Sequence, residues 1–188
     1  MDAERALEEL KAIDRAVYSA IADTPTPSLD EPIRRLSDAA NYSRLWIAIA
    51  AVLAIVAGRR GRRAAASGLA AIGVTSALVN QGVKRAYPRR RPDRDGEEVA
   101  EERRVRMPDS TSFPSGHSAS AFAFATAAGR FVPEIGAPLR LLAAGVAYSR
   151  VHTGVHYPGD ALIGSPIGAS TGSAVAAATR LWLQKRAG

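Results

Sequence analysis

The sequence predicts an all-α integral membrane protein, a helical bundle of about five transmembrane helices preceded by an N-terminal amphipathic helix. Two observations carry this prediction. Charge is crowded into residues 1–44 and 84–106, whereas long stretches elsewhere are nearly free of charge. Four or five such apolar stretches are also more than a domain of this size can cover with its own polar surface, which argues against a soluble bundle of Ala-rich helices.

The first 40 residues form an amphipathic, interfacial N-terminal segment. Within 2–22, apolar residues recur at three- and four-residue spacing among acids and bases, which predicts a helix lying on the membrane surface. These apolar residues are Leu7, Leu10, Ile13, Val17 and Ile21. Prolines then interrupt the helix, and a short amphipathic stretch at 33–40 leads into the membrane domain, which we assign to 41–188.

The apolar stretches predict the spans one by one. The basic run RRGRR at 59–63 stops the first, and the second offers 20 uncharged residues, about the number needed to cross a bilayer. The later spans are rich in Ala, Gly, Ser and Thr, which lets membrane helices pack closely. The predicted spans are 41–58, 64–83, 115–132, 139–148 and 161–183.

The composition narrows the range of partners. The 25 Lys and Arg exceed the 18 Asp and Glu by 7, an excess that suits membrane lipids or a phosphorylated substrate. The sequence has no arginine-rich tail, nucleic-acid motif or aromatic stacking platform, so no nucleic acid is expected. It has no cysteine, which excludes disulfides and thiolate chemistry.

Three polar clusters fall at helix ends that share one membrane face. Counting the crossings places KRAYPRRRP (84–92), PSGH (114–117) and SRVHTGVHYPGD (149–160) together. All three histidines of the chain belong to these clusters. Separate accidents would rarely bring such segments to one face, so we place the active site between residues 84 and 160.

The clusters contain what phosphoryl transfer requires. Lys84, Arg91 and Arg150 bring three cations to a group with three equatorial oxygens. Ser115 and the Gly116 N–H, at a predicted helix N-terminus, add neutral donors.

The histidines supply the reacting groups. His156 is the candidate nucleophile, which would form a phosphohistidine, and Asp160 would orient it. His117 would protonate the departing alkoxide. His152 is expected to be structural or supporting. The remaining arginines of the first cluster and its continuation are expected to contact lipid headgroups or to be solvated; they are Arg85, Arg89, Arg90 and Arg94.

These segments resemble the three signature motifs of the type 2 phosphatidic acid phosphatase superfamily. The first motif corresponds to Lys84 with Arg91-Pro92, the second to Pro-Ser-Gly-His at 114–117, and the third to Ser149-Arg150 with His156 and Asp160; every motif position is filled. The resemblance implies the same residue roles as given above, with no metal and no cofactor. It does not cover the N-terminal 40 residues.

The resemblance implies a lipid phosphate substrate, a phosphomonoester or diphosphate of a phospholipid or polyprenyl lipid. An Arg- and Ala-rich composition favours a high-GC bacterium, for which a prenyl-phosphoryl sugar phosphate is a candidate substrate.

Two alternatives to a lipid phosphatase stay open. One is a vanadate-dependent haloperoxidase-like enzyme, and the other is a non-catalytic protein that binds or transports lipid phosphates.

The predicted location is the bacterial cell membrane. Five spans place the N-terminus and the active site on the same side, and a charged, amphipathic N-terminus without a cleavable signal favours the cytoplasmic face. Basic residues lie on both faces, so the positive-inside rule does not decide. Whether the protein forms a homo-oligomer is left open.

Overall fold

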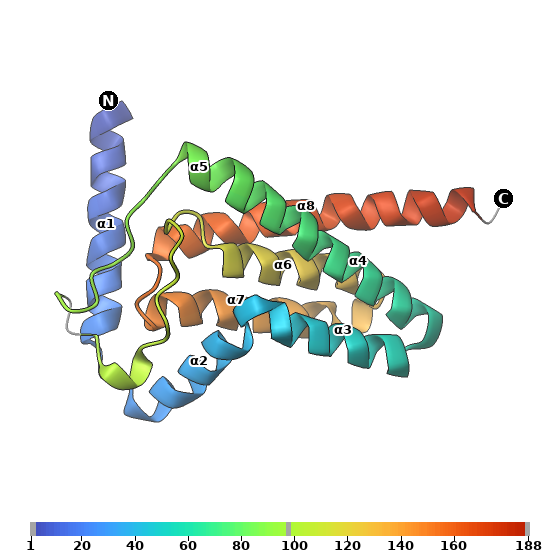
Figure 1. Cartoon of the computed structure of the whole chain (residues 1–188), viewed down its shortest axis with the longest axis horizontal. Helices are drawn as coiled ribbons and strands as arrows, with labels where there is room; N and C mark the ends of the chain where they lie inside the picture. Colours follow the sequence, from blue (N-terminus) through green and yellow to red (C-terminus); the bar gives the residue numbers. More distant parts are fainter. Residues whose placement is uncertain (1–2, 97–98, 187–188) are drawn as a thin grey trace.

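The computed structural model describes residues 3–96 and 99–186, and all regular elements of this part are helical (Figure 1). This confirms the predicted all-α class. The α-helices are α1 (Ala3–Asp23), α2 (Pro27–Ala39), α3 (Arg44–Val56), α4 (Gly58–Ala77), α5 (Lys84–Ala86), α6 (Gly116–Gly129), α7 (Gly136–His152) and α8 (Pro158–Lys185). Short 3-10 turns lie at Asn41–Ser43 (η1), Glu101–Arg103 (η3) and Pro133–Ile135 (η4), and a π-helical turn lies at Leu78–Val83 (η2).

The N-terminal amphipathic helix is α1, which stands across the end of the bundle where α8 begins (Figure 1). Its inner side buries Tyr18 in a cluster with Val99 and with residues of α7 and α8. The predicted apolar stripe points elsewhere. Leu7, Leu10 and Ile13 are each more than half exposed, so the protein itself leaves most of this stripe uncovered.

Helices α3 and α4 form a hairpin, and RRGRR does not end the first helix as predicted, because α3 already ends at Val56. All four arginines of RRGRR lie inside α4, which begins at Gly58. Gly58 reverses the chain with φ +54°, after which arginine, a good helix former, continues the helix. A Cβ on Gly61 would lie 1.8 Å from the Leu53 carbonyl oxygen, so this glycine permits the hairpin's close approach.

Helix α7 extends further toward the site than the predicted 139–148. It runs to His152 and therefore carries Arg150 in its last turn. Gly154 follows with φ +69°, a left-handed backbone conformation that is common just after a helix end. Residues between this glycine and Pro158 form the short connection to α8 that holds His156.

Helices α6 and α8 pack through a seam of glycines. A Cβ built on Gly164, Gly168 or Gly172 of α8 would lie 2.6, 1.9 or 2.5 Å from a backbone oxygen of α6. These oxygens belong to residues 115, 119 and 123, so the four-residue spacing repeats on both helices. Small residues at this spacing let membrane helices approach until their backbones touch.

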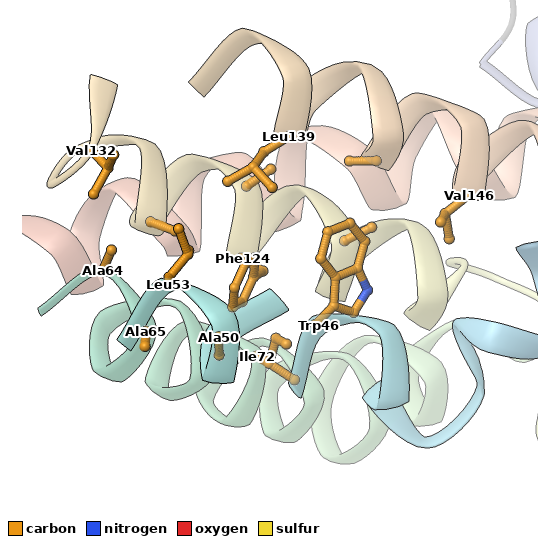
Figure 2. Packing of buried hydrophobic residues seen from close by; sticks show 14 of the residues in the cluster. Trp46, Ala50, Leu53, Ala64, Ala65, Ile72, Phe124, Val132, Leu139 and Val146 are labelled. Atoms are coloured by element: carbon orange, nitrogen blue, oxygen red, sulfur yellow. The ribbon is translucent and has the colours of Figure 1, made fainter. Parts of the chain in front are cut away.

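The main hydrophobic core fills the space between α3, α4, α6 and α7 (Figure 2). Its largest members are Trp46 and Phe124, whose ring centroids lie 5.3 Å apart. Gly68 makes room for the second ring, because a Cβ there would lie 2.7 Å from it. Most other core positions are alanines, as expected for closely packed helices.

Among the described helices, α8 alone is long and apolar enough to cross a bilayer by itself. Helices α2 and α3 pass the same test as a pair, but the chain bends by 67° between them. Helices α6 and α7 have 14 and 17 residues, fewer than the ~20 that are typical of a helix crossing a bilayer by itself. The charged RRGRR run lies within α4.

In its described residues, the hydrophilic segment after α5 has only the short turn η3 as regular structure, and Arg103 of this turn fixes the segment near its middle. The Arg103 side chain is 2% exposed, and its Nε donates to Asp30 Oδ1 at 2.9 Å. Its Nη1 donates to two of the last carbonyls of α1, and its Nη2 donates to the Thr24 carbonyl just after that helix. His152 Nε2 lies 3.0 Å from the same Asp30 oxygen. This buried network joins α1, α2, α7 and the hydrophilic segment.

Candidate active site

Three distant segments meet at the end of the bundle, around a cavity of about 200 Å³. The end of η2 with α5 and the following loop forms one wall, the first turn of α6 a second, and the connection between α7 and α8 a third. Ser115, Arg150 and Asp160 are fully buried and do not line the cavity. The predicted residues that line it are Lys84, Arg91, Gly116, His117 and His156.

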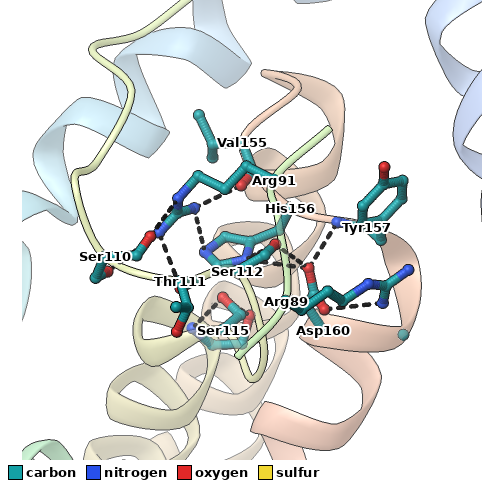
Figure 3. A network of polar contacts seen from close by, with 12 residues as sticks. Arg89, Arg91, Ser110, Thr111, Ser112, Ser115, Val155, His156, Tyr157 and Asp160 are labelled. Carbon is teal, nitrogen blue, oxygen red and sulfur yellow. Dashed lines mark hydrogen bonds and ion pairs between the residues drawn. The ribbon is translucent and has the colours of Figure 1, made fainter. Parts of the chain in front are cut away.

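The His156 ring lies between the Asp160 carboxylate and the Arg91 guanidinium (Figure 3). Its Nδ1 lies 3.4 Å from Asp160 Oδ2 and 3.3 Å from Ser112 Oγ, while its Nε2 lies 3.3 Å from Arg91 Nη1. Burial lowers the pKa of His156 to about 4, although the Asp160 contact acts in the opposite direction. The imidazole is therefore neutral at pH 7, and Nε2 is the nitrogen that faces the cavity's cations.

Asp160 is itself fixed at both carboxylate oxygens (Figure 3). Its Oδ2 accepts a hydrogen bond from the Tyr157 N–H at 2.9 Å and a short one from the Ser112 hydroxyl. Its Oδ1 accepts from Arg89 Nη1 at 3.0 Å. The sequence prediction missed Ser112, because a serine two residues before the Pro-Ser-Gly-His stretch has no distinguishing spacing.

Arg91 and Lys84 are the cations exposed to the cavity. Arg91 is clamped by carbonyls, since Nη1 donates to Val155 O at 2.6 Å and Nε donates to Ser110 O at 2.8 Å. Lys84 Nζ donates to Ser110 Oγ at 2.8 Å. Lys84 is buried and Arg91 is half-buried, and burial lowers the pKa of Arg91, a guanidinium that remains charged at neutral pH.

The first turn of α6 combines a side-chain cap with backbone donors. Ser115 Oγ accepts from Ser118 N at 3.3 Å, and the Ser115 N–H donates to Asp160 O at 2.9 Å. The Ser115 side chain thus caps the helix in this structure, and its predicted contact with phosphate stays a prediction. The Gly116 N–H has no acceptor within the helix, as for every first-turn amide, and Gly116 lines the cavity.

His117 contacts a residue that the sequence did not indicate. Its Nε2 lies 3.0 Å from Asn41 Oδ1, in the bend between α2 and α3. Asn41 Nδ2 in turn donates to Asp38 Oδ1 at 3.3 Å, which leaves Oδ1 as the acceptor for His117. In this arrangement the Nε2–H of His117 donates to Asn41 Oδ1, and the His117 side chain lines the cavity. The sequence signal that could have indicated Asn41 was its place beside a bend, just before an apolar run.

Arg150 lies in the wall behind the cavity. Its Nη1 donates to Ser37 Oγ at 2.7 Å and to Ser37 O at 3.3 Å. Its buried Nε has no partner among the described residues. Arg150 does not reach the surface of the cavity, so its predicted contact with a substrate phosphate stays a prediction.

The expectation that Arg89 and Arg94 are solvated or lipid-facing is wrong. Arg89 pairs with Asp160 and with Asp14 of α1, and Arg94 Nη1 donates to Val105 O at 2.8 Å. Neighbouring carboxylates and carbonyls capture these side chains because the loop folds back over the end of the bundle. Arg90 is exposed, in agreement with the prediction.

One cavity wall is polar although it belongs to apolar helices. Ser76 of α4 and Ser120 of α6 lie 3.5 Å apart through their hydroxyls, and Asn80 of η2 lines the same cavity. The Asn80 side chain forms no hydrogen bond within the described part of the chain. The π-helical turn changes the helical phase here, and such turns are frequent at functional sites.

In chemical terms, the site places a neutral imidazole, oriented by a carboxylate, opposite cations and backbone donors. A second imidazole with an N–H faces the same cavity from another helix. This set suits attack on a phosphorus atom followed by protonation of the leaving oxygen. Over residues 3–96 and 99–186, no group of three or more His, Cys, Asp or Glu is arranged to hold a metal ion.

Comparison with known proteins agrees with this chemistry. The family model of the PAP2 superfamily matches residues 64–185. A decaprenylphosphoryl-5-phosphoribose phosphatase from Mycobacterium tuberculosis is 35% identical over 174 residues, which cover 92% of each chain. A protein of the same name from Mycolicibacterium smegmatis is 34% identical over 150 residues, or 79% of this chain and 77% of that one.

Two solved structures share the architecture. LpxE from Aquifex aeolicus superposes with a TM-score of 0.67 at 25% identity, covering 87% of this chain and 94% of the other. A transmembrane PAP2-type phosphatidylglycerolphosphate phosphatase from Bacillus subtilis gives a TM-score of 0.63 at 24% identity, with 94% and 87% covered. The second match shows the fold alone.

Proposed function

This chain belongs to the PAP2 superfamily, and from that premise we propose that it removes the terminal phosphate of a prenyl-phosphoryl sugar phosphate at the membrane. The coarser statement, that it is a membrane lipid phosphatase, is shown by the family and its relatives. The main observation that supports the finer one is the activity after which the mycobacterial relatives are named; the alignment with the Mycobacterium tuberculosis protein covers 92% of this chain. The polar wall of Ser76, Asn80 and Ser120 supports a headgroup that carries hydroxyls.

The first step forms a phosphohistidine. The neutral His156 Nε2 attacks phosphorus, and the bond between phosphorus and the sugar oxygen breaks. Lys84, Arg91 and the Gly116 N–H stabilise the charge on the equatorial oxygens. Asp160 stabilises the positive charge that develops on the imidazole.

The leaving alkoxide needs a proton, which His117 supplies from Nε2. The negative charge of the bound phosphate favours the protonated imidazolium of His117. Substrate binding therefore promotes protonation of the residue that acts as the acid. In the second step His117, now neutral, accepts a proton from water as the water oxygen attacks phosphorus. The P–N bond breaks, phosphate leaves, and His156 is neutral again.

The membrane placement proposed here keeps five crossings, made by α3, α4, α6, α7 and α8. Large apolar side chains on α3, α4, α7 and α8 are exposed at the surface of the bundle, as expected for lipid contact; they include Ile55, Val74, Leu141, Leu162 and Trp182. The uncovered stripe of α1 would lie in the headgroup region. This arrangement brings the cavity to the lipid–water boundary, where a lipid phosphate is found.

The absence of cysteine makes this placement directly measurable. Single variants Asp109→Cys, near the cavity, and Gln184→Cys, at the far end of α8, would be labelled with a membrane-impermeant maleimide. Five crossings predict labelling from opposite sides, and a cytoplasmic cavity predicts that Asp109→Cys reacts only in permeabilised cells. Labelling of both from the same side would contradict the five-span arrangement.

Phosphate release by the purified protein in detergent, with EDTA present, tests the activity. The substrates are phosphatidate, phosphatidylglycerol phosphate, a polyprenyl phosphate, a polyprenyl diphosphate and a prenyl-phosphoryl pentose phosphate. We expect the last to be preferred and the His156→Ala variant to lose at least about 10³-fold in kcat. Equal activity of His156→Ala would refute the mechanism, and a preference for phosphatidate would refute the proposed substrate.

A further inference from the structure

A chain of charges connects the N-terminal helix with the active site. Asp14 of α1 accepts a hydrogen bond from Arg89 Nη1 at 2.7 Å, and the same nitrogen donates to Asp160 Oδ1 at 3.0 Å. The three side chains are 12%, 25% and 0% exposed in that order. Water therefore screens these pairs much less than it screens the exposed ion pairs elsewhere on α1.

Arg89 holds the side of Asp160 that faces away from the nucleophile. Asp160 Oδ2 faces His156, whereas Oδ1 faces Arg89 (Figure 3). In the described part of the chain, no other Lys or Arg forms an ion pair with Asp160. Without this partner, one oxygen of a buried carboxylate would lack a hydrogen bond, and rotation would move Oδ2 away from the imidazole.

Arg89 in turn needs α1 for its own position. Its guanidinium stacks on the Tyr157 ring at 4.1 Å, and its Nη1 donates to Asp14. Asp14 also accepts from the Gly159 N–H, in the first turn of α8, at 2.6 Å. One carboxylate of α1 thus binds both the arginine and the helix start that carries Asp160.

We infer that Arg89 and Asp14 are positioning residues for the phosphoryl-transfer reaction, and that α1 belongs to the catalytic unit in addition to any contact with lipid. Asp14 fixes Arg89, and Arg89 fixes the carboxylate that orients His156. This inference rests on the proposed function of His156 as the nucleophile. It assigns roles to an arginine outside the three signature motifs and to a helix that those motifs do not reach.

The test compares two neighbouring arginines. Arg89→Gln and Arg90→Gln remove the same charge one residue apart, but only Arg89 contacts Asp160. We expect Arg89→Gln to lower kcat by about 10- to 100-fold with little change in KM, as for other residues that orient a reacting group. Arg90→Gln should keep the wild-type kcat. Arg89→Lys, which retains the charge, should recover part of the loss.

Asp14→Asn gives a second measurement in case Arg89→Gln does not fold. It should lower kcat by up to about 10-fold, and its effect should largely vanish in the Arg89→Gln background, because the two residues act in series. Rapid-quench measurement of phosphoenzyme formation should show the same slowing, since positioning affects the attack itself.

The outcomes separate this inference from the proposed function. If His156→Ala is inactive while both Arg89→Gln and Asp14→Asn match Arg90→Gln, the positioning role is overturned and the mechanism stands. If kcat is retained and only KM rises, Arg89 binds substrate instead of orienting Asp160, and the inference is again overturned. If His156→Ala remains active, the proposed mechanism itself fails.

Discussion

The glycine seam between α6 and α8 gives a quantitative test of the site's geometry through Gly168→Ala. A Cβ at this position would lie 1.9 Å from the Ala119 carbonyl oxygen, whereas ordinary contacts between such atoms are about 3.5 Å. The obstacle is backbone, so it cannot rotate away. The two helices must separate locally by about 1–1.5 Å to accommodate one methyl group.

This separation acts on the reaction because the two helices carry different halves of the site. His117 lies two residues before Ala119 on α6, and Asp160 lies in the first turn of α8. A displacement of about 1 Å between reacting groups can cost about 10²-fold in rate. Overpacking should also destabilise the fold by about 1–3 kcal/mol, which lowers Tm by about 2–4 °C per kcal/mol.

The matched control is Gly73→Ala on α4. A Cβ there meets nothing within 4 Å, so this variant gains only the helix preference of alanine, up to about 1 kcal/mol. The difference between the two variants therefore isolates the steric cost of the seam. Tm in detergent and kcat on the best substrate are the measurements. If Gly168→Ala matches Gly73→Ala in both, the close backbone contact and the rigidity inferred from it are refuted.

Three further predictions concern the chemistry. His117→Gln should lose about 10²–10⁴-fold on an alkyl phosphate but much less on p-nitrophenyl phosphate, whose leaving group needs no proton; equal losses would argue against an acid role. Because burial lowers the pKa of His156 to about 4, kcat/KM, corrected for substrate ionisation, should show no decline as pH falls from 7 to 5 and should decline only near pH 4. A decline beginning near the ordinary value of 6.5 would contradict a buried neutral nucleophile. Asn80→Leu should reduce activity on a prenyl-phosphoryl pentose phosphate more than on phosphatidate, and an equal reduction would remove Asn80 from headgroup recognition.

The sequence predicted the helical class, the approximate helices and which segments meet at the site. Apolar periodicity and uncharged stretches are local properties, so α1 and α8 could be predicted to within a few residues. Motif spacing identified Lys84, Arg91, His117 and His156, which all line one cavity. The helix ends were less accurate at RRGRR, where a left-handed glycine rather than the charge ends α3.

Contacts between distant segments could not be predicted in this way. Asn41, Ser112 and Arg89 reach the site only because a bend, an irregular loop and α1 fold over it, and none of them has a distinctive spacing in the sequence. An arginine among several arginines looks solvated until a buried carboxylate is placed beside it. The partner of each such side chain is a property of the tertiary structure.

The buried Arg103 has a consequence for how the protein can vary in length. By fastening the hydrophilic segment to Asp30, to the end of α1 and to Thr24, it divides one long connection into two shorter ones. The first connection runs from Arg91 to Arg103. The second runs from Arg103 to Ser110 and Ser112. Residues inserted around Asp95 would be absorbed by an exposed turn. The same insertion between Arg106 and Ser110 would shift the serines that hold Lys84 and Asp160, so tolerance to insertion should change sharply at this one arginine.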